Sequence, residues 1–121
     1  MKIFESTENY LETILILSQA NEKVRSIDIV NELNFSRPSI SVAMKHLREN
    51  GYIEMSGNYI TLTGKGREIA ERTLERHTII SDWLISLGVD PKTASEDACR
   101  IEHDMSEQSF SAMKKFILNN K

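Results

Sequence analysis

The order of the elements predicted for residues 1–62 limits most strongly how this 121-residue chain can fold. Apolar residues recur with helical spacing over 6–19, over 26–33 and again after Pro38. Two β-favouring runs come next, 52–55 and 59–62, and three turn-forming residues separate them, as expected for a β-hairpin. The chain is therefore expected to be mainly α-helical, with one small hairpin.

The rest of the chain shows helical spacing over 67–86, over 91–105 and after Ser106. With 40% hydrophobic and 27% charged residues, the composition is typical of a compact protein rather than a disordered one. No run approaches the roughly 18 apolar residues of a membrane-spanning helix, and Met1 to Glu5 resemble neither a signal peptide nor a transit peptide. We therefore expect a cytoplasmic protein without a membrane partner, and the single cysteine fits that compartment.

A helix, a short helix, a tight turn, a third helix and a hairpin are, in this order, the parts of a winged helix-turn-helix. The second helix of such a pair reaches base edges in the major groove of double-stranded DNA, and Arg37 is best suited to read guanine because its guanidinium is a bidentate donor. The same residues could merely cap a helix, and the wing tip carries no basic residue. The predicted DNA contacts are Ser36, Arg37, Pro38, Ser39, Ser41, Val42 and Lys45.

A possible metal site lies further along the chain. Cys99, Glu102 and His103 fall at i, i+3 and i+4, so a helix through them would point a sulfur, a carboxylate and an imidazole to one side. Such mixed donors hold a first-row divalent ion at about 2.0 to 2.3 Å. His77 and Glu12 fall beside apolar positions and are further candidate donors. Each also has a plain structural interpretation, as a core histidine, a rim charge or a small buried thiol.

Five motifs spread over nearly the whole chain carry a family resemblance: Glu8 to Ile14, Ser39 to Ser41, Leu62 to Gly66, Arg76-His77 and Ala98 to Ser106. Together they resemble the diphtheria-toxin-repressor and manganese-transport-regulator family of metal-dependent transcriptional repressors. The resemblance implies a winged helix-turn-helix over 1–64 and a helical dimerisation and metal-binding domain over 65–121. It implies a homodimer, with neither enzyme activity nor a small-molecule substrate, that binds palindromic operator DNA when loaded with metal and controls metal-homeostasis genes.

The resemblance also implies which residues bind metal. Cys99 is as in iron-type members, Glu12 is as in manganese-type members, and Asn9 matches neither type. Ser81 and Ser95 stand where iron-type members have an ancillary site. The implied ligands are Asn9, Cys99, Glu102 and His103 for a principal ion, and Glu12 and His77, with Glu102 and Cys99 shared, for a second ion.

A thiolate is a soft ligand, so Fe(II) is the first expectation and Mn(II) the next, with Co(II), Ni(II) and Zn(II) able to bind in vitro. Trp83, Leu84 and Leu87 are candidates for the dimer surface, although the intramolecular core is an equal alternative. A winged-helix regulator that responds to a small molecule or to cysteine oxidation is the alternative function. A thiolate–imidazole enzyme is disfavoured, because no glycine-rich loop or helix N-terminus is obviously placed to stabilise an oxyanion.

Overall fold

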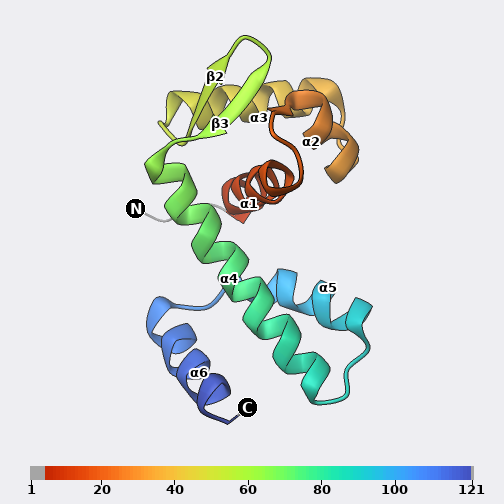
Figure 1. The fold of residues 1–121 in the computed structure, drawn as a ribbon, viewed down its shortest axis with the longest axis vertical. Coiled ribbons are helices and arrows are strands. Elements are labelled where there is room, and N and C mark those ends of the chain that lie inside the picture. The colour runs from red at the N-terminus through yellow and green to blue at the C-terminus, as the bar shows by residue number, and fades with distance from the viewer. Residues whose placement is uncertain (1–4, 121) are drawn as a thin grey trace. The chain divides into compact units, whose positions relative to one another are not determined.

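The computed structural model describes residues 5–120, so residues 1–4, where no targeting signal is expected, lie outside it (Figure 1). The chain forms two compact units, Met1–Glu71 and Arg72–Lys121, and their boundary falls within one helix. The predicted domain boundary after residue 64 stays a prediction. The elements are α1 (Glu5–Ala20), β1 (Val24–Arg25), α2 (Ser26–Leu33), α3 (Arg37–Glu49), β2 (Ile53–Ser56), β3 (Tyr59–Leu62), α4 (Gly64–Ser86), α5 (Pro91–Ile101) and α6 (Glu107–Asn119).

The helix-turn-helix of the first unit is built by local signals. Asn34 ends α2 in the left-handed conformation, with φ of 59°, which asparagine tolerates better than most residues. Ser36 then caps α3: its hydroxyl oxygen accepts a hydrogen bond from the Ser39 backbone N–H at 3.3 Å, and a proline follows in the first turn. The helices bury one shared apolar core, formed by Leu11, Ile14, Leu15, Ile29, Ile40, Met44 and Leu47.

The predicted hairpin is present but belongs to a sheet of three strands, in the order β1-β3-β2. Its loop has two residues rather than the three predicted, because Ser56 pairs with Tyr59. Gly57, the first loop residue, has φ of 63°, as glycine does in tight hairpin turns. The two-residue strand β1 pairs antiparallel with β3, while α3 contacts β2 and α1 contacts β3 (Figure 1).

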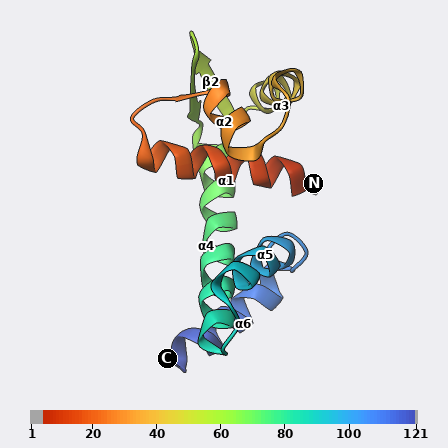
Figure 2. The same ribbon diagram turned by 90° about the vertical axis from the view of Figure 1, so that its right-hand side faces the viewer.

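The second unit consists of α4 from Arg72 onward, α5 and α6 (Figure 2). Each of the three helices contributes one residue to a buried cluster, Ile80, Ala98 and Phe110. The cap residues are local again, since the Asp90 carboxylate accepts the first N–H groups of α5 and the Ser106 hydroxyl accepts that of Ser109 in α6.

Several boundaries and orientations differ from the sequence expectation. The helix α4 begins at Gly64 instead of about Arg67, and α5 ends at Ile101 instead of Met105. Two apolar residues within the helically spaced segments are not covered, since Phe116 is 62% exposed and Ile101 is 37% exposed. Helical periodicity alone does not determine which apolar positions the neighbouring elements cover.

Candidate metal centre and nucleic-acid interface

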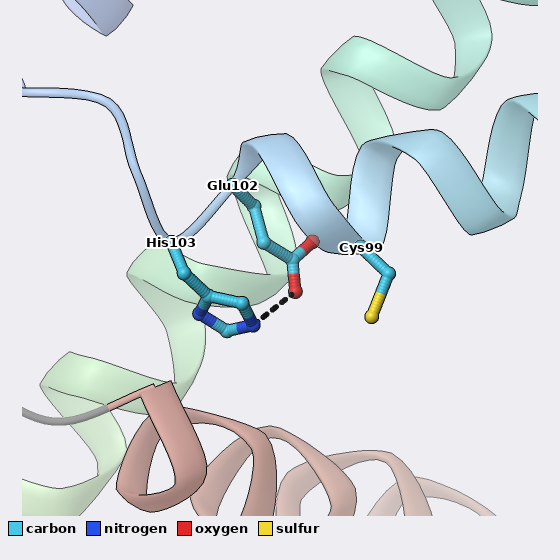
Figure 3. Close-up of side chains that lie close together, drawn as sticks. All are labelled: Cys99, Glu102 and His103. Atoms are coloured by element: carbon cyan, nitrogen blue, oxygen red, sulfur yellow. Dashed lines mark ion pairs between the residues drawn. The ribbon is translucent and has the colours of Figure 1, made fainter.

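The predicted metal donors Cys99, Glu102 and His103 lie close together at the C-terminal end of α5 (Figure 3). The helix ends before Glu102, so the expected continuous helix through all three residues is wrong. Glu102 nevertheless keeps helical backbone angles, φ −58° and ψ −26°, and its N–H bonds to the Ala98 carbonyl at 2.9 Å. Cys99 and Glu102 therefore retain their one-turn spacing, whereas His103 lies in the turn that follows.

One donor atom from each of these three side chains lies within 4.8 Å of the others. Ligands around a tetrahedral ion at about 2.0 to 2.3 Å are roughly 3 to 4 Å apart, so small side-chain rotations would bring these three donors to the positions of three ligands around one ion. The Glu102 and His103 side chains are 0% and 1% exposed, and Cys99 is partly exposed. Sulfur, oxygen and nitrogen donors in this arrangement fit a transition-metal ion.

The Glu102 carboxylate is the centre of this cluster. Its Oε1 atom lies 3.3 Å from His103 Nε2, within ion-pair distance, but accepts no well-aligned hydrogen bond from the part of the chain that the structure describes. Its Oε2 atom lies 2.9 Å from His77 Nδ1. A buried carboxylate oxygen without a hydrogen bond is costly, and a bound cation would remove that cost. This oxygen is the observation that best supports a metal at the cluster.

His77, predicted as a ligand, reaches the same carboxylate from α4. Its ring is 26% exposed, and its Nε2 atom lies 3.3 Å from the Ser95 hydroxyl. A neutral His77 that donates from Nδ1 to Glu102 can accept the Ser95 hydroxyl proton at Nε2. In this tautomer, Ser95 and His77 form a hydrogen-bonded chain that ends at the Glu102 carboxylate.

The remaining predicted ligands, Asn9 and Glu12, belong to α1 in the first unit. Asn9 is half-buried, and its backbone carbonyl accepts a hydrogen bond from the Thr13 hydroxyl at 2.8 Å. Glu12 is 8% exposed. Their contribution to a metal site stays a prediction.

The predicted DNA-contacting face is exposed on α3 and its cap. Ile40, Met44 and Leu47 face the core of the first unit and are buried. The other side of the helix therefore remains free for a partner. Every predicted contact residue is exposed there: Ser36, Arg37, Pro38, Ser39, Ser41, Val42 and Lys45.

Two further basic residues lie beside the wing, outside the recognition helix. Strand β1 places Arg25 opposite Tyr59 of the wing, and the Lys23 ammonium lies 4.6 Å from the centre of the Tyr59 ring. Both basic residues are exposed. The wing tip itself lacks a cation, but Arg25 of β1 and Lys23, just before this strand, lie beside the wing. Only the pairing of β1 with β3 reveals this, because a two-residue strand has no readable periodicity.

Comparison with known proteins agrees with a division of the chain into a DNA-binding part and a metal-binding part. The family model described as the iron dependent repressor N-terminal DNA binding domain matches residues 2–59, and the iron dependent repressor metal binding and dimerisation domain matches 63–121. An HTH-type transcriptional regulator of Methanocaldococcus jannaschii is 35% identical over 116 residues, which cover 93% of both chains. The transcriptional regulator MntR of Escherichia coli is 34% identical over 113 residues, covering 93% of this chain and 73% of MntR.

Among solved structures, that of the manganese regulator SloR is similar, with a TM-score of 0.81 and 27% identity. The match covers 95% of this chain and 54% of SloR, so this chain spans about half the length of that protein. In the part of the chain that the structure describes, no helix is both long and apolar enough to cross a membrane.

A winged helix-turn-helix with an exposed recognition helix, followed by a helical unit with clustered metal donors, defines the class of metal-dependent transcriptional regulators. The chain belongs to the iron-dependent repressor family. The predicted resemblance, the mainly helical fold, and the function of a dimeric, metal-dependent repressor that binds DNA are thereby confirmed. The ligating residues and the physiological metal stay predictions.

Proposed function

We propose that this protein represses its target genes when Fe(II), or next in preference Mn(II), binds at Cys99, Glu102 and His103. The observation that carries the proposal is the buried Glu102 carboxylate, one oxygen of which faces His103 without an aligned hydrogen bond. A divalent cation would supply the positive charge that this cluster needs. The thiolate of Cys99 favours Fe(II) over harder ions, whereas affinity order alone would also admit Co(II), Ni(II) and Zn(II).

The metal preference is tested by an anaerobic titration of operator DNA against protein loaded with Mn(II), Fe(II), Co(II) or Zn(II). Fe(II) is expected to activate operator binding at a lower free-metal concentration than Mn(II), because the thiolate is a soft donor, whereas Co(II) and Zn(II) bind in vitro by raw affinity order. Equal operator affinity with every ion and with chelator would reject metal control.

Asn9 and Glu12 are proposed as ligands on the strength of the family resemblance. Asn9 would complete the principal site, and Glu12 would join His77 around a second ion, with Glu102 and Cys99 shared between the two ions. Counting bound ions separates the two roles. The variant Glu12→Gln should reduce the stoichiometry from two ions to one per chain, whereas Asn9→Ala should weaken the principal site.

The coupling between metal and DNA follows from the connection between the units. Helix α4 contains the boundary of the two units, so it joins the unit with the clustered donors to the DNA-binding unit. The bound ion would select one arrangement of the two recognition helices of a dimer. In that arrangement the helices would lie about 34 to 36 Å apart, or a multiple of that spacing, and would match successive major grooves. By linkage, operator DNA must then tighten metal binding by the same factor by which the metal tightens operator binding.

For DNA recognition, Arg37→Ala is expected to cost about 1 to 3 kcal/mol of operator affinity and to relax specificity at one base pair. Arg37 lies at the exposed N-terminus of α3, where a recognition helix reads base edges. Quantitative electrophoretic shifts against single-base operator variants measure both effects.

Lys45→Ala serves as the comparison for this prediction, because Lys45 is an exposed basic residue further along α3. It should weaken all DNA sequences similarly and reduce the salt dependence of binding by about one phosphate contact. An Arg37→Ala variant that keeps full base discrimination would contradict the assigned role.

The dimer surface is proposed on the groove between the C-terminal ends of α4 and α6. Trp83 and Leu87 line this groove, which has a volume of about 450 Å³, together with Phe116 and Leu118. Leu84, the third predicted dimer residue, packs instead against the core cluster. Leu87 and Phe116 are 63% and 62% exposed, and two such apolar side chains in one groove are typical of a surface that a second copy covers.

A charge placed in this groove is expected to produce monomers. Phe116→Glu should shift the molecular mass in sedimentation or light scattering from dimer to monomer and weaken operator binding, because an isolated carboxylate would be buried in an apolar interface. Ser111→Glu, which adds the same charge at an exposed position of α6, should leave the dimer intact. A dimeric Phe116→Glu protein would place the interface elsewhere.

A further inference from the structure

One arginine of α4 is buried where an apolar side chain would be expected. Arg76 lies on the same stripe of the helix as Ile69, Thr73 and Ile80, all of which are buried. Its exposed fraction is 7%. A buried guanidinium loses much of its hydration, so its contacts must compensate for that loss.

The contacts of Arg76 are directed at one short segment. Its Nη1 atom donates hydrogen bonds to the backbone carbonyls of Glu102, at 3.0 Å, and Met105, at 2.7 Å. Its Nη2 atom donates to the Glu107 carboxylate at 3.0 Å, and its guanidinium carbon lies 5.1 Å from the centre of the Phe110 ring. The three acceptors therefore span the turn from the end of α5 to the start of α6.

His103 lies in this turn, after the end of α5. Arg76 binds a carbonyl on either side of His103 in the sequence, while the neighbouring His77 contacts the Glu102 carboxylate. Consecutive residues of α4 thus hold the backbone and the side chain of Glu102. An imidazole on a loose turn would sample many positions, and this arrangement reduces that freedom before any ion arrives.

Stability alone is a weak reason for a buried arginine at this position. Its carboxylate partner, Glu107, has a side chain that is 68% exposed, so solvent screens the attraction between the two charges. Apolar residues often replace buried ion pairs without loss of stability. A lysine would keep the charge but could not reproduce the planar fork that reaches two carbonyls and a carboxylate.

We propose that Arg76 is a positioning residue for the metal centre: its guanidinium fixes the Glu102–Met105 turn so that the Glu102 and His103 donors are preorganised. This inference rests on the proposed function, because it requires that Cys99, Glu102 and His103 bind an ion. It assigns to α4 a role in metal affinity that does not depend on direct coordination by Arg76.

The test uses Co(II) added anaerobically to the full chain, because this ion reports a thiolate ligand and the coordination geometry by its absorption bands. Arg76→Lys is expected to weaken Co(II) binding roughly 10- to 100-fold, the effect typical of losing a group that orients a ligand. The visible bands at saturating Co(II) should also change in intensity. Arg72→Lys, an exposed position on the same helix, should bind Co(II) like the unmodified protein.

Two further variants separate positioning from folding. Arg76→Met removes the charge with a side chain of similar length, and Glu107→Gln removes only the exposed ion-pair partner. If Arg76 positions the turn, Arg76→Met should lose Co(II) affinity as Arg76→Lys does, and Glu107→Gln should change it less than about threefold, as expected for a screened pair. The metal-free unfolding temperature of each variant shows whether the fold survives.

The outcomes are distinct. Unchanged Co(II) affinity and an unchanged saturated spectrum in Arg76→Lys would overturn the inference, whether or not Arg76→Met folds. Weakened affinity in Arg76→Lys supports it even if Arg76→Met is unfolded. Absence of a thiolate-to-Co(II) band in the unmodified protein would instead refute the proposed metal site itself.

Discussion

Replacing Cys99 with alanine is expected to remove most of the metal-dependent gain in operator affinity while leaving the metal-free protein folded. The loss should exceed the roughly 10- to 100-fold that follows from removing an outer partner of a ligand, because a donor atom itself disappears. Cys99 is partly exposed, so its truncation leaves little cavity and should lower the unfolding temperature only slightly. Operator binding with and without chelator, beside thermal unfolding of the metal-free protein, measures the two effects.

His103→Ala should show the same loss of metal response, although its buried side chain makes some loss of stability unavoidable. Asp104→Ala is the matched control, because Asp104 is the exposed neighbour of His103 in the same turn. Operator binding by Cys99→Ala that still depends fully on metal would remove this residue from the site. Release of operator by an oxidant, with no effect of chelator on the unmodified protein, would favour the alternative trigger by cysteine oxidation.

Substitution of Gly66 by alanine is expected to cause the largest loss of stability. A Cβ atom at this position of α4 would overlap the backbone carbonyl of Tyr52, and the same carbonyl accepts the Thr63 N–H at 3.0 Å. Both partners are main chain, so neither can move aside by a side-chain rotation. We expect a loss of about 3 kcal/mol or more in the free energy of unfolding, in the range of severe steric replacements.

Gly64 provides the control for this prediction, since a Cβ there meets no atom within 4 Å. Gly64→Ala lies in the first turn of the same helix and should be neutral, or stabilising by up to about 1 kcal/mol, because alanine restricts the unfolded chain. Chemical denaturation of both variants gives the comparison. Equal stability of Gly66→Ala and Gly64→Ala would show that the helix shifts to relieve the overlap at little cost.

Elements whose signals are local were predictable from the sequence. The bounds predicted for α2, 26–33, are those observed, and Ser36 and Ser106 cap the helices that they were expected to precede. A cap or a tight turn depends on a few neighbouring residues, so its chemistry can be read from them directly. The exposed face of α3 follows in the same way from the spacing of its buried residues.

Features that depend on distant residues were not predictable in this way. Strand β1 exists only because β3 lies beside it, and the early end of α5 coincides with the two carbonyls that Arg76 binds from α4. Arg76 itself gave one signal, a basic residue on an apolar stripe, but periodicity cannot name the acceptor of its hydrogen bonds. The exposure of Phe116 likewise depends on what lies next to α6.

The sequence by itself determined the class of fold, the recognition helix and the three donors of the proposed metal centre, because each depends on residue type and short spacing. Tertiary structure alone decided that the Glu102 carboxylate is buried between two histidines and that an arginine of another helix holds its backbone. The contacts of His77 and Arg76 with Glu102 join residues 25 and 26 positions apart, and only the packing of α4 against the turn after α5 brings them within hydrogen-bond distance.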